Sequence, residues 1–506
     1  MRCLLILAHP RRDSLCGALF DAYAKGARLA GVQCRELVLC DMQFDPDVHT
    51  LSPEQQALEP DLLRAQRDIA WAEHLVFFYP TWWGTFPALL KGFLDRVLTP
   101  GFAFRHRTVD LWDRLLAGRT ADLIISMDTP PLVYRLVYRA PGRQAMARAT
   151  LAYCGVDTVH TQSFGPVITS HVQQRTRWLE QAQASGARLE HGARSPWQRW
   201  RKNIASWFAA LRLQFYPMTW MAYTVGALLA SAGGVLSLPA YLWGYCVLFL
   251  VEAATVFLND WFDLESDRRN HNAGRFSGGS RVLVDGRLDH GAMRQGIGWA
   301  LMGAGAGLAG LLAVAPTASA PVIAVLYVGM SLLALGYTVP PFKLSHRGWG
   351  ELDVMLTHSA GAIVAGYVAQ GGAWTDSLPW LLALPLGLSI LPAILLANCP
   401  DRDADQATNK RTLVVILGKR SSARLAMAAS LAAPAVALLL SLARPDLAAL
   451  LRWSVVAGAA HGMWLYWHLR KFMHTDMPER IDNTIVLALT FILWFCVPPL
   501  LTLALA

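Results

Sequence analysis

The chain has 506 residues, a formal net charge of +9 and 54% hydrophobic residues. This length predicts two or more domains. The basic residues are dispersed over many loops rather than gathered in one stripe with aromatic residues, which argues against a nucleic-acid partner. The eight cysteines form no CxxC pair, so neither a disulfide framework nor a zinc site is expected.

The first part of the chain alternates apolar runs with polar loops. The run at residues 3–8 is too short for a signal peptide and lacks a cleavage site, so it predicts a buried first strand. Further strands are predicted at 74–78 and 121–126, and an amphipathic helix at 15–30. This alternation predicts an α/β doubly wound parallel sheet with its ligand beyond the carboxyl ends of the strands.

Three loops follow these strands. The loop from His9 to Ser14 precedes the first helix and suits a phosphate, because free N–H groups and the helix dipole favour an anion there. The second strand leads into Tyr79–Gly84 and the third into Met127–Pro131. All three loops are expected at one edge of the sheet.

The segment 79–97, which begins Tyr-Pro-Thr-Trp-Trp-Gly, resembles the signature of flavodoxin-like NAD(P)H:quinone oxidoreductases. Ala8-His9-Pro10 with Ser14 resembles that family's first phosphate loop, and the resemblance covers residues 1 to about 180. It implies a flavin, FMN or FAD, with NAD(P)H as reductant. The implied flavin-binding residues are His9, Ser14, Leu15 and Cys16 at the phosphate, and Pro80, Thr81, Trp82, Trp83 and Gly84 along the isoalloxazine edge.

One loop departs from that family. Better-known members carry Thr-Thr-Gly-Gly where this chain has Met127–Pro131, and its prolines remove backbone donors. A domain that has lost its flavin is therefore an open alternative. Two separate alternatives are that His9 is an ordinary strand-end residue and that Trp82 and Trp83 are core packing.

The composition changes after the soluble domain, which is expected at 1–185. A basic amphipathic linker at 186–210 is expected on the membrane surface, followed by a membrane domain at 211–506. Nine apolar runs there are long enough to cross a bilayer. They lie at 214–236, 239–258, 291–313, 319–338, 353–370, 378–397, 423–443, 447–467 and 483–505.

Loop charge predicts the orientation of these spans. Lys and Arg concentrate before the first span and after the even-numbered ones. The positive-inside rule then predicts a multi-pass protein of the inner (cytoplasmic) membrane. The N-terminal domain and the loops after spans two and six are expected in the cytoplasm, and the C-terminus on the opposite side.

Two acidic clusters follow spans two and six. The first contains Asn259, Asp260, Asp263 and Asp267, and the second contains Asn398, Asp401 and Asp405. Steps of three and four residues place such side chains on one helix face, where like charges repel. Hard oxygen ligands of this kind suit Mg²⁺ carrying a diphosphate. Two solvated acidic loop starts are the alternative.

The nine spans and the paired clusters resemble the UbiA superfamily of membrane aromatic prenyltransferases. Residues 259–267 match its NDxxDxxxD motif and residues 401–405 its DxxxD motif, and the resemblance covers about 210–506. It implies a prenyl diphosphate and an aromatic acceptor as substrates. Mg²⁺ and diphosphate binding are assigned to Asn259, Asp260, Asp263, Asp267, Asp401 and Asp405, with Asn398 as a further diphosphate contact.

Cationic and aromatic residues complete the predicted site. Lys343, Lys410 and Arg281 are candidate contacts to phosphate oxygens, with ordinary positive-inside loop charge as the alternative. Tyr337 is a candidate to shield an allylic cation through its ring face, or an interfacial tyrosine. His271, His346, His358 and His461 are isolated in the sequence, and His358 favours a satisfied polar contact over a catalytic base.

Together these patterns predict a bifunctional membrane enzyme. Its flavin domain reduces a quinone-like ring with NAD(P)H, and its membrane domain prenylates a hydroquinone or phenol in quinone-type biosynthesis. The alternatives are a prenyltransferase with a flavin-free docking domain, and a quinone reductase with a membrane anchor. The acceptor, the prenyl chain length and the coupling of the two activities stay open, as does the homodimer that the reductase resemblance implies.

Overall fold

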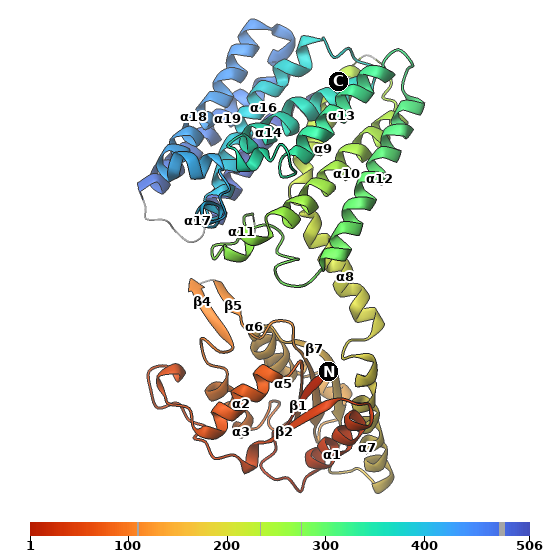
Figure 1. Cartoon of the computed structure of the whole chain (residues 1–506), viewed down its shortest axis with the longest axis vertical. Helices are drawn as coiled ribbons and strands as arrows, with labels where there is room; N and C mark the ends of the chain where they lie inside the picture. The colour runs from red at the N-terminus through yellow and green to blue at the C-terminus, as the bar shows by residue number, and fades with distance from the viewer. Residues whose placement is uncertain (109–110, 233, 275, 475–480, 506) are drawn as a thin grey trace. The chain divides into compact units, whose positions relative to one another are not determined.

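The computed structural model describes residues 1–108, 111–232, 234–274, 276–474 and 481–505. The chain divides into two compact units, Met1–Arg201 and Lys202–Ala506 (Figure 1). The boundary falls within helix α8, Pro196–Leu211, in the segment predicted as an amphipathic linker. Trp197 and Trp200 stack on this helix with ring centroids 4.6 Å apart.

The first unit is a five-stranded parallel sheet with helices on both faces. The strand order β2-β1-β3-β6-β7 confirms the predicted doubly wound fold, with the ligand edge expected at its switch point. The strands are β1 Arg2–Leu7, β2 Gln33–Val38, β3 His74–Pro80, β6 Thr120–Ser126 and β7 Asp157–Phe164, and a separate hairpin pairs β4 Phe104–Thr108 with β5 Leu111–Arg114. The helices are α1 Leu15–Leu29, α2 Pro60–Trp71, α3 Ala88–Val97, α4 Pro131–Leu136, α5 Pro141–Gln144, α6 Ala152–Cys154 and α7 Val172–Ala187.

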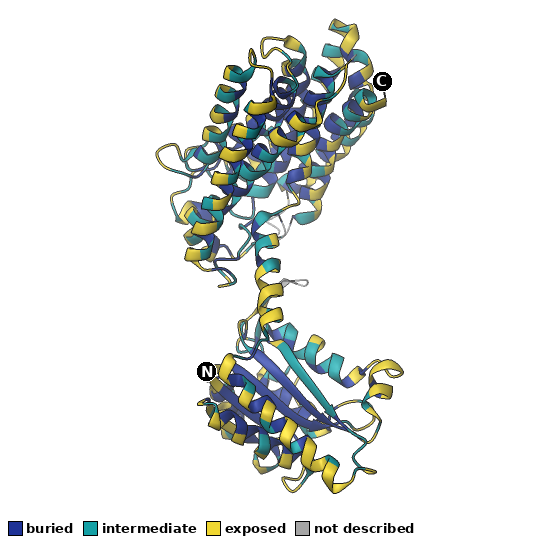
Figure 2. Cartoon of the chain, turned by 90° about the vertical axis from the view of Figure 1, so that its right-hand side faces the viewer, coloured by how far each residue is buried: buried dark blue, intermediate teal, exposed yellow. Residues whose placement is uncertain are grey.

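Strand β1 shows why this sheet is buried on both faces. Leu4 and Ile6 belong to the core under α2 and α3, whereas Leu5 and Leu7 belong to the core under α1 and α7. Side chains alternate along a strand, so a run that is apolar at every position needs cover on both sides. The buried strands lie between helices with exposed outer faces (Figure 2).

The three loops predicted to meet at the sheet edge do so. The N–H of Ala8 donates to the carbonyl of Phe78 at 2.8 Å, and that of Thr81 donates to Ser126 at 2.7 Å. Strands β1, β3 and β6 therefore end side by side, and the loops that follow them share one edge.

The second unit is helical (Figure 1). Its helices are α9 Tyr216–Ala230, α10 Leu238–Phe262, α11 Leu264–Arg269, α12 His290–Val314, α13 Ala320–Gly336, α14 Gly350–Leu356, the π-helical turn η6 Thr357–Gly361, α15 Ala362–Ala369, α16 Ser377–Asn398, α17 Arg402–Ala407, α18 Leu413–Ala443, α19 Pro445–His474 and α20 Asp482–Leu505. Helix α18 is interrupted at Gly418, which has a φ of +75°.

Six helical segments in the described residues are long and apolar enough to cross a membrane. They are Leu238–Phe262, His290–Val314, Gly350–Ala369, Ser377–Asn398, Leu413–Ala443 and Asp482–Leu505. The other three predicted spans coincide with α9, α13 and α19. With 15 and 17 residues, α9 and α13 are shorter than the roughly 20 residues that a perpendicular span needs, so nine spans are not confirmed and stay a prediction.

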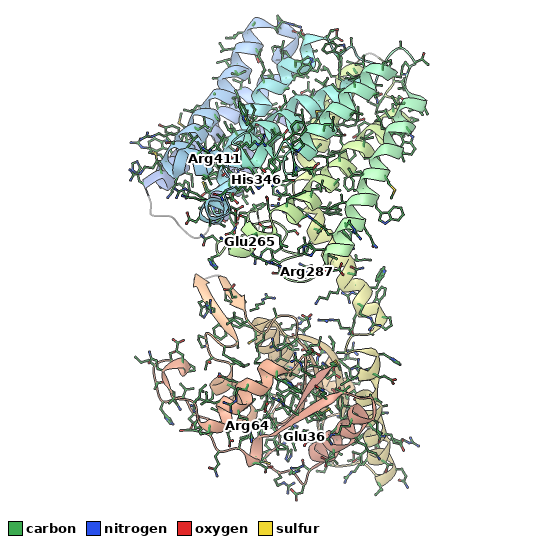
Figure 3. All side chains as sticks on the ribbon, in the orientation of Figure 1. Glu36, Arg64, Glu265, Arg287, His346 and Arg411 are labelled. Carbon is green, nitrogen blue, oxygen red and sulfur yellow. The ribbon has the colours of Figure 1, made fainter. Side chains whose placement is uncertain are left out.

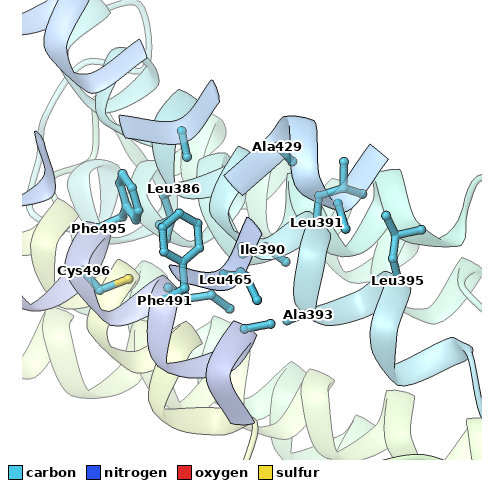
Figure 4. Packing of buried hydrophobic residues seen from close by; sticks show 14 of the residues in the cluster. Leu386, Ile390, Leu391, Ala393, Leu395, Ala429, Leu465, Phe491, Phe495 and Cys496 are labelled. Carbon is cyan, nitrogen blue, oxygen red and sulfur yellow. The ribbon is translucent and has the colours of Figure 1, made fainter. Parts of the chain in front are cut away.

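The bundle core combines large apolar side chains with close backbone crossings. Leu386 and Ile390 of α16 lie in one cluster with Leu465 of α19 and Phe491 of α20 (Figure 4). Helices α9 and α15 cross where a Cβ on Gly226 would lie 1.8 Å from the carbonyl oxygen of Ile363. Such small-residue crossings let transmembrane helices approach closely.

Replacing Gly226 with alanine is expected to destabilise the helical unit by about 1–3 kcal/mol, the usual cost of overpacking. The reason is that the carbonyl oxygen of Ile363 cannot move away without separating α9 from α15. Thermal unfolding of the purified protein in detergent measures the effect. Gly305→Ala on α12 is the matched control, because its Cβ meets no atom within 4 Å. Equal melting temperatures for the two variants would contradict this account.

Candidate active site

Both acidic clusters lie where a long helix breaks. Helix α10 ends at Phe262, and Asp263 separates it from the short helix α11, with the N–H of Asp263 still donating to Asn259 at 2.9 Å. The N–H of Asp267 donates to the carbonyl of Asp263 at 2.8 Å, so the four-residue spacing continues across the break. The second cluster also spans a helix break, because α16 ends at Asn398 and α17 begins at Arg402.

Hydrogen bonds join the two clusters into one site. Ser266 donates to Oδ1 of Asp405 at 2.7 Å, and Asn270 donates to Oδ1 of Asp401 at 2.7 Å. The N–H of Gly278 donates to the other oxygen of Asp401 at 3.0 Å. Segments that are more than 120 residues apart in the chain therefore present their carboxylates together.

Lys410 is the cation at the centre of this site. Its Nζ lies 2.7 Å from Oδ2 of Asp263 and 3.6 Å from Oδ1 of Asp405, and its side chain is only 12% exposed. Burial alone lowers the pKa of Lys410, but the two carboxylates outweigh burial and hold that pKa well above its usual value. Lys410 therefore stays charged and binds the two acidic segments together.

One lysine leaves the site short of positive charge. Burial, followed by the charges of Asp260, Asp263 and Asp401, raises the pKa of Asp267 to about 8. Burial likewise raises the pKa of Asp405 to about 6, against the lowering effect of Lys410. Oδ1 of Asp263 and Oδ2 of Asp405 are buried without a hydrogen-bond partner in the described part of the chain. Further cationic charge is needed to ionise all of these carboxylates together.

The donor set fits Mg²⁺ bound together with phosphate oxygens better than a closed protein cage. Both oxygens of Asp260 accept hydrogen bonds from Ser280, and both oxygens of Asp401 are likewise engaged. Among the described residues, the one tight group of three possible ligands is Asp45, Asp47 and His49, which is exposed and lies in the first unit. Mg²⁺ commonly takes one or two carboxylates and completes its shell with water and substrate phosphate.

A cavity of about 240 Å³ opens beside these carboxylates. This is several times the roughly 30 Å³ that one water molecule occupies. One part of its lining is polar and consists of Arg212, Asn259, Asp263, Asp267, Gly278, Gly279, Tyr337, Asn398, Asp401 and Lys410. Another part is apolar and includes Leu248, Val251, Val256, Met330, Ile390, Ile394, Leu489 and Ile492.

Not every predicted site residue reaches the cavity. The described lining lacks Asp260 and Asp405, which instead hold Ser280 and Ser266. It also lacks Arg281 and Lys343. Arg281 donates to the carbonyl of Asp267 at 2.9 Å and thereby fixes the backbone of the first cluster.

Two neighbouring acidic residues lie outside the site. Glu265 is exposed and pairs with Arg269 at 2.8 Å, and Asp403 is exposed beside Arg402. His346, which is isolated in the sequence, lies at the site, because its Nε2 is 3.6 Å from Oδ1 of Asp263. Glu265 and His346 both lie at the end of the bundle that carries α11 and α17 (Figure 3).

Three cavity residues escaped the sequence analysis. Arg212 lies among the basic residues that precede α9, where its charge looks like ordinary topology. Glu252 is a carboxylate within the apolar helix α10, and Asp353 lies near the start of α14. An ionisable residue inside a predicted membrane span is itself a signal of function. The sequence alone showed this signal for Glu252.

The first unit offers an anion site at the start of α1. Ser14 caps this helix by accepting a hydrogen bond from the N–H of Gly17 at 3.2 Å. The N–H groups of Leu15 and Cys16 have no hydrogen-bond acceptor among the described residues, as expected of a first helical turn. The thiol of Cys16 is buried 3.1 Å from the hydroxyl of Ser126, and burial raises its pKa to about 11. This thiol therefore stays uncharged at the start of α1.

The tryptophans predicted at the flavin edge lie on a tight turn. Trp82 and Thr85 exchange backbone hydrogen bonds at 2.8 and 3.0 Å, and Trp83 and Gly84 between them have positive φ. Trp83 is fully exposed and Trp82 is about half exposed, so the core-packing alternative is wrong for both. The ring of His9 contacts Trp82 edge-on, with 5.8 Å between centroids. Thr81 has a buried hydroxyl without a partner in the described residues.

The prolines of the third loop begin a helix. Pro131 is the first residue of α4, and Pro130 before it has no N–H to offer. The hydroxyl of Tyr134 on α4 donates to the carbonyl of Gly84 at 3.2 Å, which holds the Trp82–Gly84 turn in place. This loop supports its neighbour but offers fewer backbone donors to a ligand.

Comparison with known proteins matches both units. Residues 219–492 match the UbiA prenyltransferase family, and residues 1–185 match the flavodoxin-like fold. Over 153 residues the chain is 31% identical to a ribosyldihydronicotinamide dehydrogenase-like protein, traD, of Penicillium crustosum, covering 25% of this chain and 57% of that protein. Over 111 residues it is 33% identical to an uncharacterized NAD(P)H oxidoreductase, YcaK, of Escherichia coli, covering 20% of this chain and 55% of that protein.

A longer match and a solved structure complete these findings. An uncharacterized NAD(P)H oxidoreductase of Haemophilus influenzae is 27% identical over 195 residues, which cover 37% of this chain and 96% of that protein. The solved NAD(P)H:quinone oxidoreductase of Methanothermobacter marburgensis is 26% identical with a TM-score of 0.33. It covers 38% of this chain and 98% of that structure.

Mg²⁺ and inorganic diphosphate together are expected to raise the melting temperature of the full-length protein in detergent, because they neutralise buried charges. Asp263→Asn removes the carboxylate that contacts Lys410 and is expected to raise the ligand concentration needed by about tenfold or more. Glu265→Gln, on the exposed side of α11, is the control and is expected to behave as wild type. An Asp263→Asn variant with a wild-type response would refute this site.

Proposed function

Since the chain belongs to the UbiA prenyltransferase family and carries a flavodoxin-like domain related to NAD(P)H:quinone oxidoreductases, we propose that it is a bifunctional membrane enzyme. Its helical unit transfers a prenyl group from a prenyl diphosphate to an aromatic hydroquinone or phenol with Mg²⁺. Its soluble unit reduces a quinone-like ring with NAD(P)H and a flavin.

One observation carries the prenyl-transfer proposal: Lys410 pairs with Asp263 at a cavity that combines buried carboxylates with an apolar wall. Asp263 and Asp267 are the cavity-lining carboxylates offered to a metal, and Lys410 and Arg212 are the cations offered to phosphate oxygens. When bound, Mg²⁺ supplies charge neutralisation for the leaving diphosphate. The apolar lining suits an isoprenoid tail and excludes water from an allylic cation.

The transfer step balances without any further reactant. The bond between C1 of the prenyl group and the diphosphate oxygen breaks, and its electron pair leaves with the diphosphate. A ring carbon of the acceptor bonds to C1, and the proton on that carbon is released. Tyr337 lines the same cavity, where its ring face can stabilise the cation before capture.

The soluble unit supplies a reason for the fusion. A hydroquinone is electron-rich and attacks an allylic cation far more readily than a quinone does. Hydride from NAD(P)H and one proton convert the quinone into that hydroquinone. A flavin bound at the start of α1 would supply this hydride transfer. The N–H groups of Leu15 and Cys16 would hold its phosphate, and Trp82 would border its ring.

We further propose that the acidic clusters and the soluble unit lie on the cytoplasmic side. Support comes from the basic loops around the breaks at Asp263 and Asn398, which the positive-inside rule assigns to the cytoplasm. The same rule assigns the C-terminus to the opposite side.

A second candidate keeps the prenyl transfer but gives the soluble unit a flavin-free docking role. It is favoured by Pro130, which removes a backbone donor from the third loop. The two candidates differ in whether the purified protein contains a flavin.

Ser14→Asp tests the flavin site, because aspartate still caps α1 but places a negative charge at the phosphate. Ser14→Asn caps the helix without charge and is the matched control. We expect wild type and Ser14→Asn to retain flavin, measured by visible absorbance per protein, and Ser14→Asp to lose most of it. A colourless wild-type protein would favour the docking candidate.

The proposed function as a whole is tested with the full-length protein, Mg²⁺ and a prenyl diphosphate. Oxidised naphthoquinones and benzoquinones are offered with and without NAD(P)H, and prenylated product is measured by mass spectrometry. We expect product only with NAD(P)H, and at least about a hundredfold less from Asp263→Ala. Equal product without NAD(P)H would contradict the coupling, and full activity of Asp263→Ala would contradict the assigned site.

A further inference from the structure

A second set of polar side chains lines the same cavity from within the apolar helices. It includes Thr219 on α9, Glu252 on α10, Asp353 on α14 and His358 on the π-helical turn η6. We call these four residues the inner polar group. Thr255, Ser331 and Thr357 also line the cavity, but their hydroxyls donate to carbonyl groups of their own helices. Ionisable groups at membrane depth are costly, so a purpose is expected for them. The acidic clusters do not account for them, because Glu252 lies nearly two helical turns before Asn259.

Glu252 and His358 face each other without bonding. Nε2 of His358 lies 3.9 Å from Oε1 of Glu252, beyond hydrogen-bond distance. Nδ1 of His358 lies 3.1 Å from the carbonyl oxygen of Val354 and 3.0 Å from the hydroxyl of Thr357, which itself donates to the carbonyl of Asp353. Both neighbours therefore accept, so Nδ1 carries the proton. In the neutral ring Nε2 is then an acceptor, and the pair presents lone pairs from both sides to a gap that needs a donor.

Thr219 and Asp353 add buried polar atoms to the same lining. Thr219 is 7% exposed and Asp353 is 6% exposed. Oδ1 of Asp353 has no hydrogen-bond partner in the described part of the chain, and the hydroxyl of Thr219 has only the carboxyl group of Glu252 beside it. Buried polar atoms of this kind are destabilising unless a ligand or water satisfies them.

The charge of the group limits the ligand. Among the described residues, no lysine or arginine lies within 4.0 Å of the carboxylates of Glu252 or Asp353. Two acidic side chains, an imidazole acceptor and one hydroxyl, with no described cation beside them, therefore favour a neutral ligand that forms hydrogen bonds. A ring that carries its own carboxylate finds no such cation to pair with at this position.

We propose that the inner polar group is the acceptor subsite, and that it binds a neutral ring with hydroxyl groups such as a hydroquinone. The hydroxyls donate to Glu252, His358 and Asp353, and Thr219 completes the contact. This inference rests on the proposed prenyl transfer and adds its acceptor class: dihydroxylated rings are selected and aromatic carboxylic acids are rejected. The π-helical turn at His358 is consistent with such a role, because these turns recur at functional sites.

The subsite also fits the division of the cavity. The carboxylates at the helix breaks and Lys410 occupy one part of the lining, and the inner polar group belongs to the helices that form its apolar walls. A quinone gives this group only carbonyl oxygens, which cannot donate hydrogen bonds. The reduced ring can donate, so the subsite itself discriminates in favour of the product of the soluble unit.

Glu252→Gln tests the proposal, because glutamine keeps the shape of the side chain while replacing one carboxyl oxygen with an amide donor. The full-length protein is assayed with a 1,4-naphthohydroquinone under anaerobic conditions, with 4-hydroxybenzoate as the carboxylated competitor. We expect the KM for the hydroquinone to rise about tenfold or more, the range for losing a hydrogen bond to a charged group. The KM for the prenyl diphosphate is expected to stay within about twofold, and rejection of 4-hydroxybenzoate to weaken.

Two further variants keep the test decisive. Thr219→Val is neutral and nearly isosteric, and a several-fold rise in the hydroquinone KM is expected even if Glu252→Gln folds poorly. Asp403→Asn is the matched control, because that carboxylate is exposed and outside the cavity. Equilibrium binding of the hydroquinone to each protein without prenyl diphosphate gives a readout independent of turnover, and it is expected to weaken in the first two variants.

The outcomes separate this proposal from the proposed function. Wild-type prenyl transfer with an unchanged hydroquinone KM and unchanged binding in both cavity variants would overturn the subsite alone. A matching rise in the KM for prenyl diphosphate would also overturn it, since the residues then support the cavity generally. If the wild-type protein transfers no prenyl group but binds hydroquinone, and Glu252→Gln weakens that binding, the proposed prenyl transfer would be overturned. A quinol-binding site would remain.

Discussion

The ion pair between Asp263 and Lys410 is the interaction on which the rest of the site depends. It joins the break after α10 to the loop before α18, at a separation of 2.7 Å and almost out of solvent. Removing one partner of a buried ion pair leaves an uncompensated charge, which typically costs about 3–5 kcal/mol. The carbonyl of Asp263 also receives the N–H of Asp267, so the same residue positions the next carboxylate along the chain.

The electrostatics of the site follow from an unequal count of charges. Asp260, Asp263, Asp267 and Asp405 are buried at a site whose cations are Lys410 and Arg212, and burial followed by mutual repulsion raises the pKa of Asp267. A site of this kind gains stability from added cations, and those cations offset the negative charge that a bound anion adds. The apolar remainder of the cavity then determines which anion fits, since it suits a diphosphate attached to a hydrocarbon tail better than a free one.

Much of this could be predicted from the sequence, because the signals were local. Short apolar runs followed by turn residues define β1, β3 and β6, and the spacing of Asn259, Asp263 and Asp267 survives the helix break. Which carboxylates of the two clusters line the cavity and which bind loop residues could not be predicted. Asp260 and Asp401 have the same side chain as Asp263, but both of their carboxylate oxygens accept hydrogen bonds from N–H or hydroxyl groups. Arg212 and Glu252 reach the cavity only through helix packing, which no spacing rule describes.

A structure of the full-length protein with Mn²⁺ in place of Mg²⁺ and a prenyl thiodiphosphate that resists cleavage tests the central claim most directly. The account predicts metal density bridging the thiodiphosphate to Asp263 and Asp267, Lys410 near a phosphate oxygen, and the prenyl tail in the cavity between α10 and α16. Metal bound only at the exposed group of Asp45, Asp47 and His49, or a thiodiphosphate placed away from Lys410, would contradict it.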